Sequence, residues 1–218
     1  MRIELSVTQV SKSNAPARKG RLIVISGPSG VGKGTVVAAV MNNLKDLELS
    51  VSATTRTRRN HEVDEVDYHF LNRELFEAEI RLGSFYEYAE YNKNLYGTLR
   101  KTVENRLLCG IDLILEIDIQ GARSVKRLDP TAVLIYMQPP SMQELERRLR
   151  DRKTETEETI QERLRIASEE MAAVSEVYDR HYLITNNHVD SCAVDLEAII
   201  RAERSRLFTN RPNSPAAG

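Results

Sequence analysis

The chain has 218 residues, with 31 Lys and Arg against 32 Asp and Glu, so its formal net charge is −1. This balance excludes a strongly basic protein that coats nucleic acid through bulk electrostatics. The length suits one or two domains, and a hydrophobic content of 41% is enough for a buried core, which excludes wholesale disorder.

The two ends of the chain are polar. We expect residues 1–19 to be a loosely ordered extension, and residues 208–218, rich in Pro, Asn and small side chains, to be a disordered tail. No apolar run approaches the ~20 residues of a membrane helix, and the first segment lacks the apolar core of a secretory signal. These features predict a cytoplasmic protein that acts without a membrane or a nucleic acid. Cys109 and Cys192 form no CxxC pair, and we expect two buried, inert thiols.

Between the ends, short apolar runs alternate with helical patterns. Continuous apolar runs suit strands of a parallel sheet that is covered on both faces. Helical patterns are found at 36–44, at 160–178 with apolar steps of three and four, and at 196–207. The alternation predicts an α/β fold with helices on both faces of the sheet. The predicted strands are 22–25, 113–117, 133–137 and 182–184.

Two segments break this alternation. Residues 50–105 mix Thr, Arg and Tyr and predict a small antiparallel insertion, in which Tyr86, Tyr88 and Tyr91 are interpreted as packing residues. Residues 139–165 are highly charged with both signs, which predicts a solvated helix pair or a mobile flap.

A glycine-rich turn follows the first predicted strand and precedes a helix. Gly27 and Gly32-Lys33 match the pattern G-x-x-x-x-G-K in the structural context that this motif requires. Backbone N–H groups of such a loop surround phosphate oxygens, the helix N-terminus adds a positive dipole, and the lysine adds a cation. Gly34 stands where Ser or Thr normally helps to hold Mg²⁺, and whether Thr35 serves the phosphates or the metal stays open. The predicted ATP-binding residues are Gly27, Pro28, Ser29, Gly30, Val31, Gly32, Lys33, Gly34 and Thr35.

Further motifs, in order along residues 20–207, resemble those of the guanylate kinases. The resemblance implies a P-loop kinase of α/β class, with a parallel sheet flanked by helices, a mixed or antiparallel GMP-binding insertion and a helical lid. It implies transfer of the γ-phosphoryl group of ATP to GMP in guanine nucleotide metabolism and recycling, with Mg²⁺ accompanying ATP. The motifs are SVSATTRTRR at 50–59, DYHF at 67–70, FYEYA at 85–89, NLYGT at 94–98, LEIDIQGA at 115–122, PPS at 139–141, RKTETE at 152–157 and ERL at 162–164.

The same resemblance divides residues 20–207 into three parts and assigns the site residues. The core is 20–52, 103–140 and 166–207, the GMP-binding insertion is 53–102, and the lid is 141–165. Lys33 and Arg56 are placed at the reaction centre, with Arg148, Arg152 and Arg163 closing over the ATP phosphates. The remaining residues are implied to bind GMP: Arg59, Tyr68 and Tyr96 at its phosphate, and Ser52, Glu87, Thr98 and Asp118 around guanine.

The chemistry of these side chains suits the assignments. Planar Arg forks satisfy phosphate oxygens better than Lys does. Guanine presents donors at N1 and N2, which an ionised acceptor such as Glu87 or Asp118 can receive. Glu116, at the end of a predicted strand, could orient metal-bound water, so direct protein ligands of the metal are left unassigned. Asn186 is either an adenine ligand or a plain turn residue.

Two other classes of function are kept beside this one. Guanylate-kinase-like domains also occur as binding modules that have lost catalysis, but these typically lack an intact phosphate loop, and here Lys33 and the glycines are present. A kinase of sugar phosphates would not need the acceptor pair Glu87 and Asp118. The sequence leaves open the use of dGMP and a homo-oligomeric state.

Overall fold

A computed structural model describes residues 18–151, 156–178 and 182–209 of the chain. Five parallel strands form its central sheet, in the order β2-β7-β1-β8-β9. The four predicted strands are confirmed, and β2 adds an edge strand whose three residues are too short to form a recognisable apolar run. The strands are β1 (Leu22–Ser26), β2 (Leu47–Leu49), β7 (Asp112–Glu116), β8 (Val133–Gln138) and β9 (Tyr182–Thr185).

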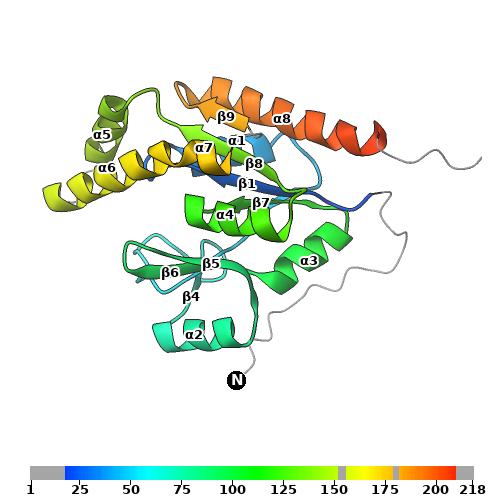
Figure 1. Cartoon of the computed structure of the whole chain (residues 1–218), viewed down its shortest axis with the longest axis horizontal. Coiled ribbons are helices and arrows are strands. Elements are labelled where there is room, and N and C mark those ends of the chain that lie inside the picture. Colours follow the sequence, from blue (N-terminus) through cyan, green and yellow to red (C-terminus); the bar gives the residue numbers. More distant parts are fainter. Residues whose placement is uncertain (1–17, 152–155, 179–181, 210–218) are drawn as a thin grey trace, which may run out of the picture.

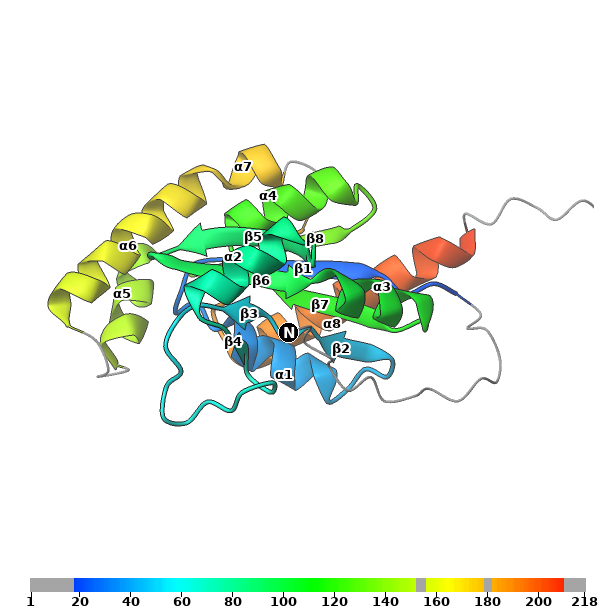
Figure 2. The same ribbon diagram turned by 90° about the horizontal axis from the view of Figure 1, so that it is seen from below.

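Helices cover both faces of this sheet (Figures 1 and 2). Because side chains alternate along a strand, Ile23 and Ile25 of β1 pack into the core beneath α1 and α8, whereas Leu22 and Val24 pack against α3, α4 and α7 on the other face. This explains why the strand is apolar at each position from Leu22 to Ile25. The helices are α1 (Lys33–Met41) and α8 (Val189–Thr209) on one face, and α3 (Arg100–Leu108), α4 (Ile119–Leu128) and α7 (Val174–Val177) on the other.

The predicted insertion forms a second sheet with the order β4-β3-β6-β5. Its strands β5 and β6 are antiparallel, but β3 pairs with β4 in parallel, so the sheet is mixed rather than wholly antiparallel. Helix α2 (Arg73–Arg81) packs under it through Phe76, whose ring stacks on Phe85 at a centroid distance of 4.4 Å. The strands are β3 (Ala53–Thr54), β4 (His69–Phe70), β5 (Phe85–Tyr91) and β6 (Asn94–Leu99).

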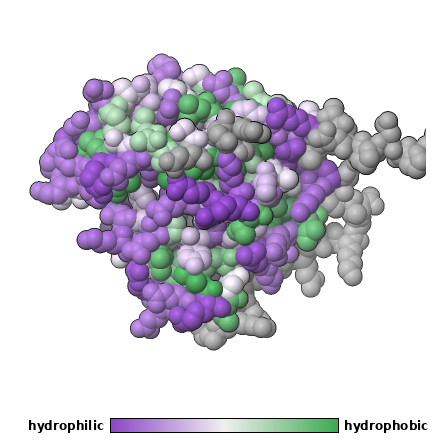
Figure 3. All heavy atoms as spheres, in the orientation of Figure 1, coloured by the Kyte–Doolittle hydropathy of each residue, from purple (hydrophilic) through white to green (hydrophobic). Residues whose placement is uncertain are grey.

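The charged segment after β8 contains two helices, α5 (Met142–Asp151) and α6 (Glu157–Ala172). They share a small apolar core, while mainly hydrophilic residues cover their outer surface at the left of Figure 3. Thr156 caps α6 by accepting a hydrogen bond from the Thr159 amide. The apolar pattern predicted at 160–178 is split at Ala173, where α6 ends and α7 begins.

Two further findings bear on the sequence analysis. None of the helices in the described ranges combines the length and the hydropathy needed to cross a membrane. Cys192 is buried as expected, but Cys109 is exposed, because it follows the last residue of α3 at the surface. The prediction of two buried thiols is therefore wrong for Cys109.

Candidate active site

The carboxyl ends of the central strands meet at one edge of the sheet, where β1 lies between β7 and β8. Parallel sheets bind ligands at such a point, because the connections after neighbouring strands leave toward opposite faces, here from β1 to α1 and from β7 to α4. A cleft with a volume of about 430 Å³ lies there. Its lining includes the glycine-rich loop, Glu116 at the end of β7, Asp118 just after it, and residues of the insertion and of α6.

The glycine-rich loop between β1 and α1 forms one side of the cleft. Its backbone requires glycine at Gly27 and Gly32, which have φ of 150° and 99°; a Cβ on Gly27 would lie 2.0 Å from the Met137 carbonyl oxygen. Lys33 is the first residue of α1, and its Nζ donates to the Gly27 carbonyl oxygen at 2.7 Å. The ammonium group is therefore held over the concave loop, at the position where phosphates would bind.

Two side chains support the loop from behind. The Val31 carbonyl oxygen accepts hydrogen bonds from Asn186 Nδ2 at 2.7 Å and from Arg148 Nη1 at 3.1 Å. Arg148 also donates to the Asn186 carbonyl oxygen at 2.9 Å. Asn186 is buried, and its side-chain amide supports the loop through its bond to the Val31 carbonyl oxygen. Arg148 lies outside the cleft lining, and Arg152 falls outside the described residues.

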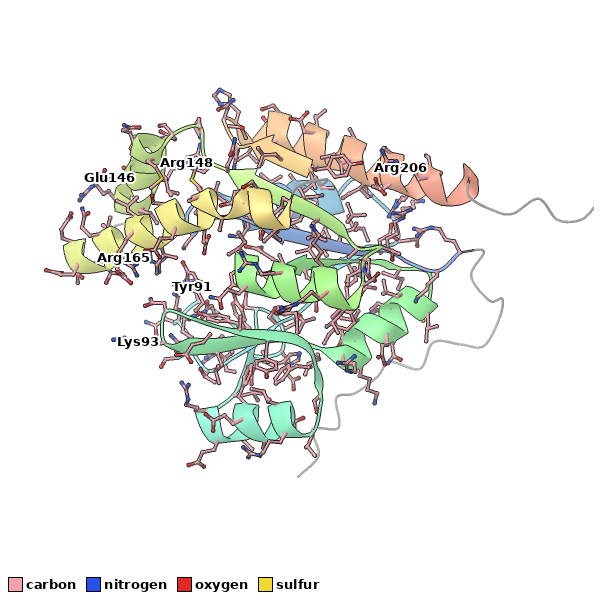
Figure 4. The ribbon with its side chains drawn as sticks, viewed as in Figure 1. Tyr91, Lys93, Glu146, Arg148, Arg165 and Arg206 are labelled. Atoms are coloured by element: carbon pink, nitrogen blue, oxygen red, sulfur yellow. The ribbon has the colours of Figure 1, made fainter. Side chains whose placement is uncertain are left out.

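Of Arg148 and Arg163, the predicted lid arginines in the described part of the chain, Arg163 lines the cleft. It projects from α6, and its Nη1 donates to the Ser29 hydroxyl oxygen at 2.6 Å. The contact joins α6 to the phosphate loop across the cleft. Figure 4 shows Arg148 on α5.

The predicted phosphate cluster Arg56, Arg59, Tyr68 and Tyr96 lines the opposite side of the cleft. Arg56 donates two hydrogen bonds to Glu62, at 3.1 and 2.7 Å, and its guanidinium lies 5.4 Å from the centroid of the Tyr68 ring. Burial opposes the charge on Glu62, but hydrogen bonds from Arg56 and from the Arg59 amide lower its pKa. Glu62 therefore orients the guanidinium within the cleft.

The predicted base-binding residues come from the insertion, which carries Glu87 and Thr98, and from the core, which carries Ser52 and Asp118. Glu87 is 5% exposed and accepts a hydrogen bond from the Thr98 hydroxyl at 2.7 Å. Burial, with the nearby Asp118 charge, raises the pKa of Glu87 to about 7 despite this bond. Asp118 caps α4 through the Gly121 amide at 2.8 Å, and burial raises its pKa as well. Ser52, Glu87 and Asp118 line the cleft, and Thr98 lies behind Glu87.

Three titratable cleft residues were missed in the sequence analysis. Glu62 lies in a loop without a recognisable pattern, and Tyr91 was assigned to packing. Glu170 follows Arg163 by seven residues, which is two helical turns, so the two side chains share one face of α6. That spacing is the one signal that could have revealed Glu170 once Arg163 was assigned.

Comparisons with known proteins agree with this geometry. The guanylate kinase family model matches residues 19–203. The guanylate kinase of Rubrobacter xylanophilus is 53% identical over 159 residues, covering 73% of this chain and 83% of the relative. The guanylate kinase of Carboxydothermus hydrogenoformans is 46% identical over 186 residues, covering 85% and 90%.

A solved structure gives the same result for the fold. The crystal structure of guanylate kinase from Anaplasma phagocytophilum superposes with a TM-score of 0.71 at 34% identity, covering 85% of this chain and 87% of that one. A family match over most of the chain, relatives at this identity and a shared fold all point the same way. The chain belongs to the guanylate kinase family.

Proposed function

We propose that this cleft transfers the γ-phosphoryl group of ATP to GMP, giving ADP and GDP. The observation that carries the proposal is that the loop with Lys33, the cluster around Arg56 and the buried Glu87 line one cleft. A phosphate loop alone fits many nucleotide-binding proteins. A second anion site together with an acceptor for a purine edge fits transfer between two nucleotides.

ATP occupies the glycine-rich loop in this proposal. The backbone amides from Gly27 to Thr35 bind its phosphates, and Lys33 exchanges the Gly27 carbonyl oxygen for β- and γ-phosphate oxygens. Arg163 is close enough to the loop to bond Ser29, so it can also reach a phosphate there. These cations neutralise the charge that develops on the transferred group.

The phosphate of GMP occupies the opposite cluster. Arg56 and Arg59 offer planar forks to its oxygens, and the hydroxyls of Tyr68 and Tyr96 donate further hydrogen bonds. The attacking phosphate oxygen is already ionised at neutral pH, so no general base is required. The task of these side chains is to bring two anions into line.

Guanine occupies the end of the cleft that contains Glu87. Ionised Glu87 accepts from guanine N1 and N2, while Asp118, Ser52 and Thr98 complete the polar surroundings. Adenine has no such pair of donors, and with AMP the buried carboxylate would be left without partners. Selection of GMP over AMP thus follows from the burial of Glu87.

The insertion 53–102 and the lid 141–165 are the parts that we propose to close over the bound nucleotides. Closure excludes water, which would otherwise accept the phosphoryl group. Arg148 sits on α5 and bonds the loop carbonyl of Val31, so the lid is tied to the phosphate site. In this proposal Arg148, Arg152 and Arg163 face the developing charge in the closed form.

The residues beside the loop fit Mg²⁺ arriving with ATP. Mg²⁺ prefers oxygen ligands and binds through one or two carboxylates together with substrate phosphates. Thr35 and Glu116 line the cleft, and a Cβ built on Gly34 would lie 3.5 Å from Glu116 Oε2, so this carboxylate faces the loop. Bound there, the ion would neutralise phosphate charge, and Thr35 and Glu116 would hold it directly or through water.

The family and the site also support a cellular role. We place the reaction in guanine nucleotide metabolism and recycling in the cytoplasm, with ATP and GMP as partners and without a nucleic acid or a membrane. A catalytically inactive binding module is less well supported, because Lys33 is present and the loop keeps the geometry that phosphate binding requires.

The test uses Lys33→Ala, with the exposed Lys45→Ala as a control. Loss of the Lys33 cation should lower kcat by about 100-fold or more, which is the size of electrostatic transition-state effects. The control should keep the parent rate of ADP release with GMP. Near-normal turnover of folded Lys33→Ala would contradict the proposed phosphoryl transfer at this loop.

A further inference from the structure

Glu170 on α6 is a cleft residue to which the proposed reaction assigns no task. It lines the cleft, yet the residue is only 8% exposed. Its Oε2 is buried and has no hydrogen-bond partner among the described residues. A buried carboxylate oxygen without a partner costs free energy, and native proteins rarely retain one without a reason. Glu170 Oε2 is therefore an acceptor that a donor on a bound ligand would satisfy.

The charges around Glu170 locate it along the cleft. Lys33 of the phosphate loop and Asp118 at the start of α4 both act on its carboxylate. The Glu170 charge also acts on Tyr91 of β5, in the insertion. Burial, reinforced by this charge, raises the pKa of Tyr91 to about 12. Figure 4 shows Tyr91 near the hairpin tip, on the side that faces α6. Glu170 thus lies near both Asp118, at the proposed base end, and Lys33, at the loop toward which the GMP phosphate must point for transfer.

Two buried tyrosines also lie close enough to Glu170 for its charge to act on their hydroxyls. Tyr136 of β8 and Tyr178 after α7 both feel the Glu170 charge. The Tyr178 hydroxyl is hydrogen-bonded to Ser26. Neither tyrosine lines the cleft, whereas Glu170 does. A donor for Glu170 can therefore arrive from the cleft side, in which the substrate binds.

The part of GMP between its base and its phosphate is the ribose. Ribose hydroxyls are O–H donors whose hydrogen bonds a carboxylate accepts well, and none of the site residues described so far is assigned to the ribose. We infer that Glu170 accepts a hydrogen bond from a ribose hydroxyl of the acceptor nucleotide and thereby favours GMP over its deoxy forms. The inference rests on the proposed function and adds a sugar-reading residue to it.

The electrostatics agree with this placement. Burial and the Asp118 charge raise the pKa of Glu170 to about 7, while Lys33 opposes that shift. A hydroxyl that donates to the carboxylate stabilises its ionised form, which offsets part of the cost of burial. Ionised Glu170 is therefore unfavourable in the free protein, and a hydrogen bond from the sugar would stabilise it.

The experiment compares Glu170→Gln with the parent on GMP, 2′-deoxy-GMP and 3′-deoxy-GMP at saturating ATP. Gln keeps the size but turns a charge-assisted hydrogen bond into a neutral one, so kcat/KM for GMP should fall about tenfold. For the deoxy form that lacks the contacted hydroxyl, the fall should be less than about twofold. The matched control is Glu169→Gln, because Glu169 is an exposed neighbour that is paired with Arg165. This variant should leave kcat/KM for all three substrates unchanged.

Equal decreases in kcat/KM for all three substrates in Glu170→Gln would overturn the inference, because the residue would then act on the fold or on ATP binding. A raised KM for ATP would do the same. If the variant fails to fold, the parent alone decides: it must prefer GMP to at least one deoxy form by about tenfold, and equal use of all three overturns the inference. A parent that phosphorylates no guanine nucleotide would instead contradict the proposed function.

Discussion

At the residue scale, the acceptor side of the cleft depends on planar arginine forks. Arg56 is held by two hydrogen bonds to Glu62 and packs over the Tyr68 ring, so its fork points into the cleft before any substrate is bound. Because this orientation exists in the free protein, little side-chain entropy is lost when GMP binds.

The first prediction follows from that fork. Arg56→Lys keeps the positive charge but cannot bind phosphate or Glu62 through two parallel hydrogen bonds, so kcat/KM for GMP should fall by about tenfold or more. KM for ATP should stay the same. Arg58→Lys is the control, because Arg58 lies outside the cleft lining and bonds the Glu62 carbonyl oxygen through one nitrogen. If only KM for ATP changed in Arg56→Lys, this arginine would belong to the other nucleotide.

The second prediction concerns the titration of Glu87. Its pKa of about 7 in the free protein means that the carboxyl is largely protonated under mildly acidic conditions, whereas guanine requires the ionised form. GMP binding must therefore release a proton there, and affinity should weaken as the pH falls below about 7, by up to about tenfold per pH unit.

Calorimetric titration of GMP from about pH 8 to about pH 6 measures this effect. Glu87→Gln serves as the reference, because the phosphate of GMP and Glu170 titrate in both proteins. The advantage in GMP affinity of the parent over Glu87→Gln should therefore shrink as the pH falls. The same variant should lower the ratio of kcat/KM for GMP over AMP about ten- to a hundredfold. A pH-independent difference would show that Glu87 does not meet the base as an anion.

Sequence patterns reveal site residues when the chemistry needs a local arrangement. The loop around Lys33 is local, because strand, glycines, lysine and helix all follow one another. Glu62 lies in a loop without periodicity although it bonds Arg56 only six residues away, and Glu170 carries no motif beyond its helical spacing from Arg163. Tyr91 was assigned to packing because an aromatic residue in a strand is most often buried, whereas the hairpin places this one at the cleft.

At the scale of elements, the phosphate loop is fixed by what packs against it. The carbonyl of Val31 is held by Asn186 from the loop after β9 and by Arg148 from α5. These contacts place the loop at one conformation relative to the sheet and the lid. The prediction of helix 36–44 and of four strands was possible because apolar periodicity reflects burial directly. The break at Ala173 and the parallel pair of β3 and β4 depend on tertiary contacts, and no local pattern encodes them.

The third prediction concerns Gly32→Ala. Alanine at this position would have to keep a φ of 99°, and its Cβ would lie 2.8 Å from Asn186 Nδ2. The Asn186 side chain, which supports the loop, must therefore move. Gly83→Ala is the matched control: its φ is also positive, at 70°, but nothing lies within 4 Å of the added Cβ. Both variants should lose about 1–2 kcal/mol from backbone strain.

Gly32→Ala alone should also raise KM for ATP and lower kcat, by about tenfold or more together. Steady-state kinetics with varied ATP, combined with thermal melts, separates strain from loop displacement. Equal kinetics in the two variants would show that the contact with Asn186 does not set the loop.

At the scale of the whole molecule, one buried carboxylate ties distant segments together. Asp112 at the start of β7 accepts hydrogen bonds from Arg18, from the Arg21 amide before β1, and from Arg204 on α8. These bonds lower its pKa although burial opposes ionisation. Because the folded pKa lies below the unfolded one, this cluster contributes stability above the ordinary Asp pKa and loses it as the pH falls through the folded value.

The fourth prediction tests that cluster far from the chemistry. Asp112→Asn leaves two arginines without their anion and should cost about 3 kcal/mol of stability, or roughly 5–10 °C in Tm. The kinetics with GMP and ATP at room temperature should not change, since the site lies at the other end of the strands. Asp195→Asn, an exposed residue on α8, should leave Tm within about 1 °C of the parent. A normal Tm for Asp112→Asn would contradict the role of the cluster.

The proposed function places a donor site, an acceptor site and a base-reading carboxylate around one cleft of the whole molecule, and the most direct measurement asks whether they act together. ADP release from ATP is followed with GMP, with AMP, with a ribose phosphate and without acceptor, and the phosphorylated product is identified. The account predicts rapid ADP release with formation of GDP, and rates with the other acceptors lower by about 100-fold or more. Equal rates with GMP and AMP, or ADP release that does not depend on an acceptor, would contradict it.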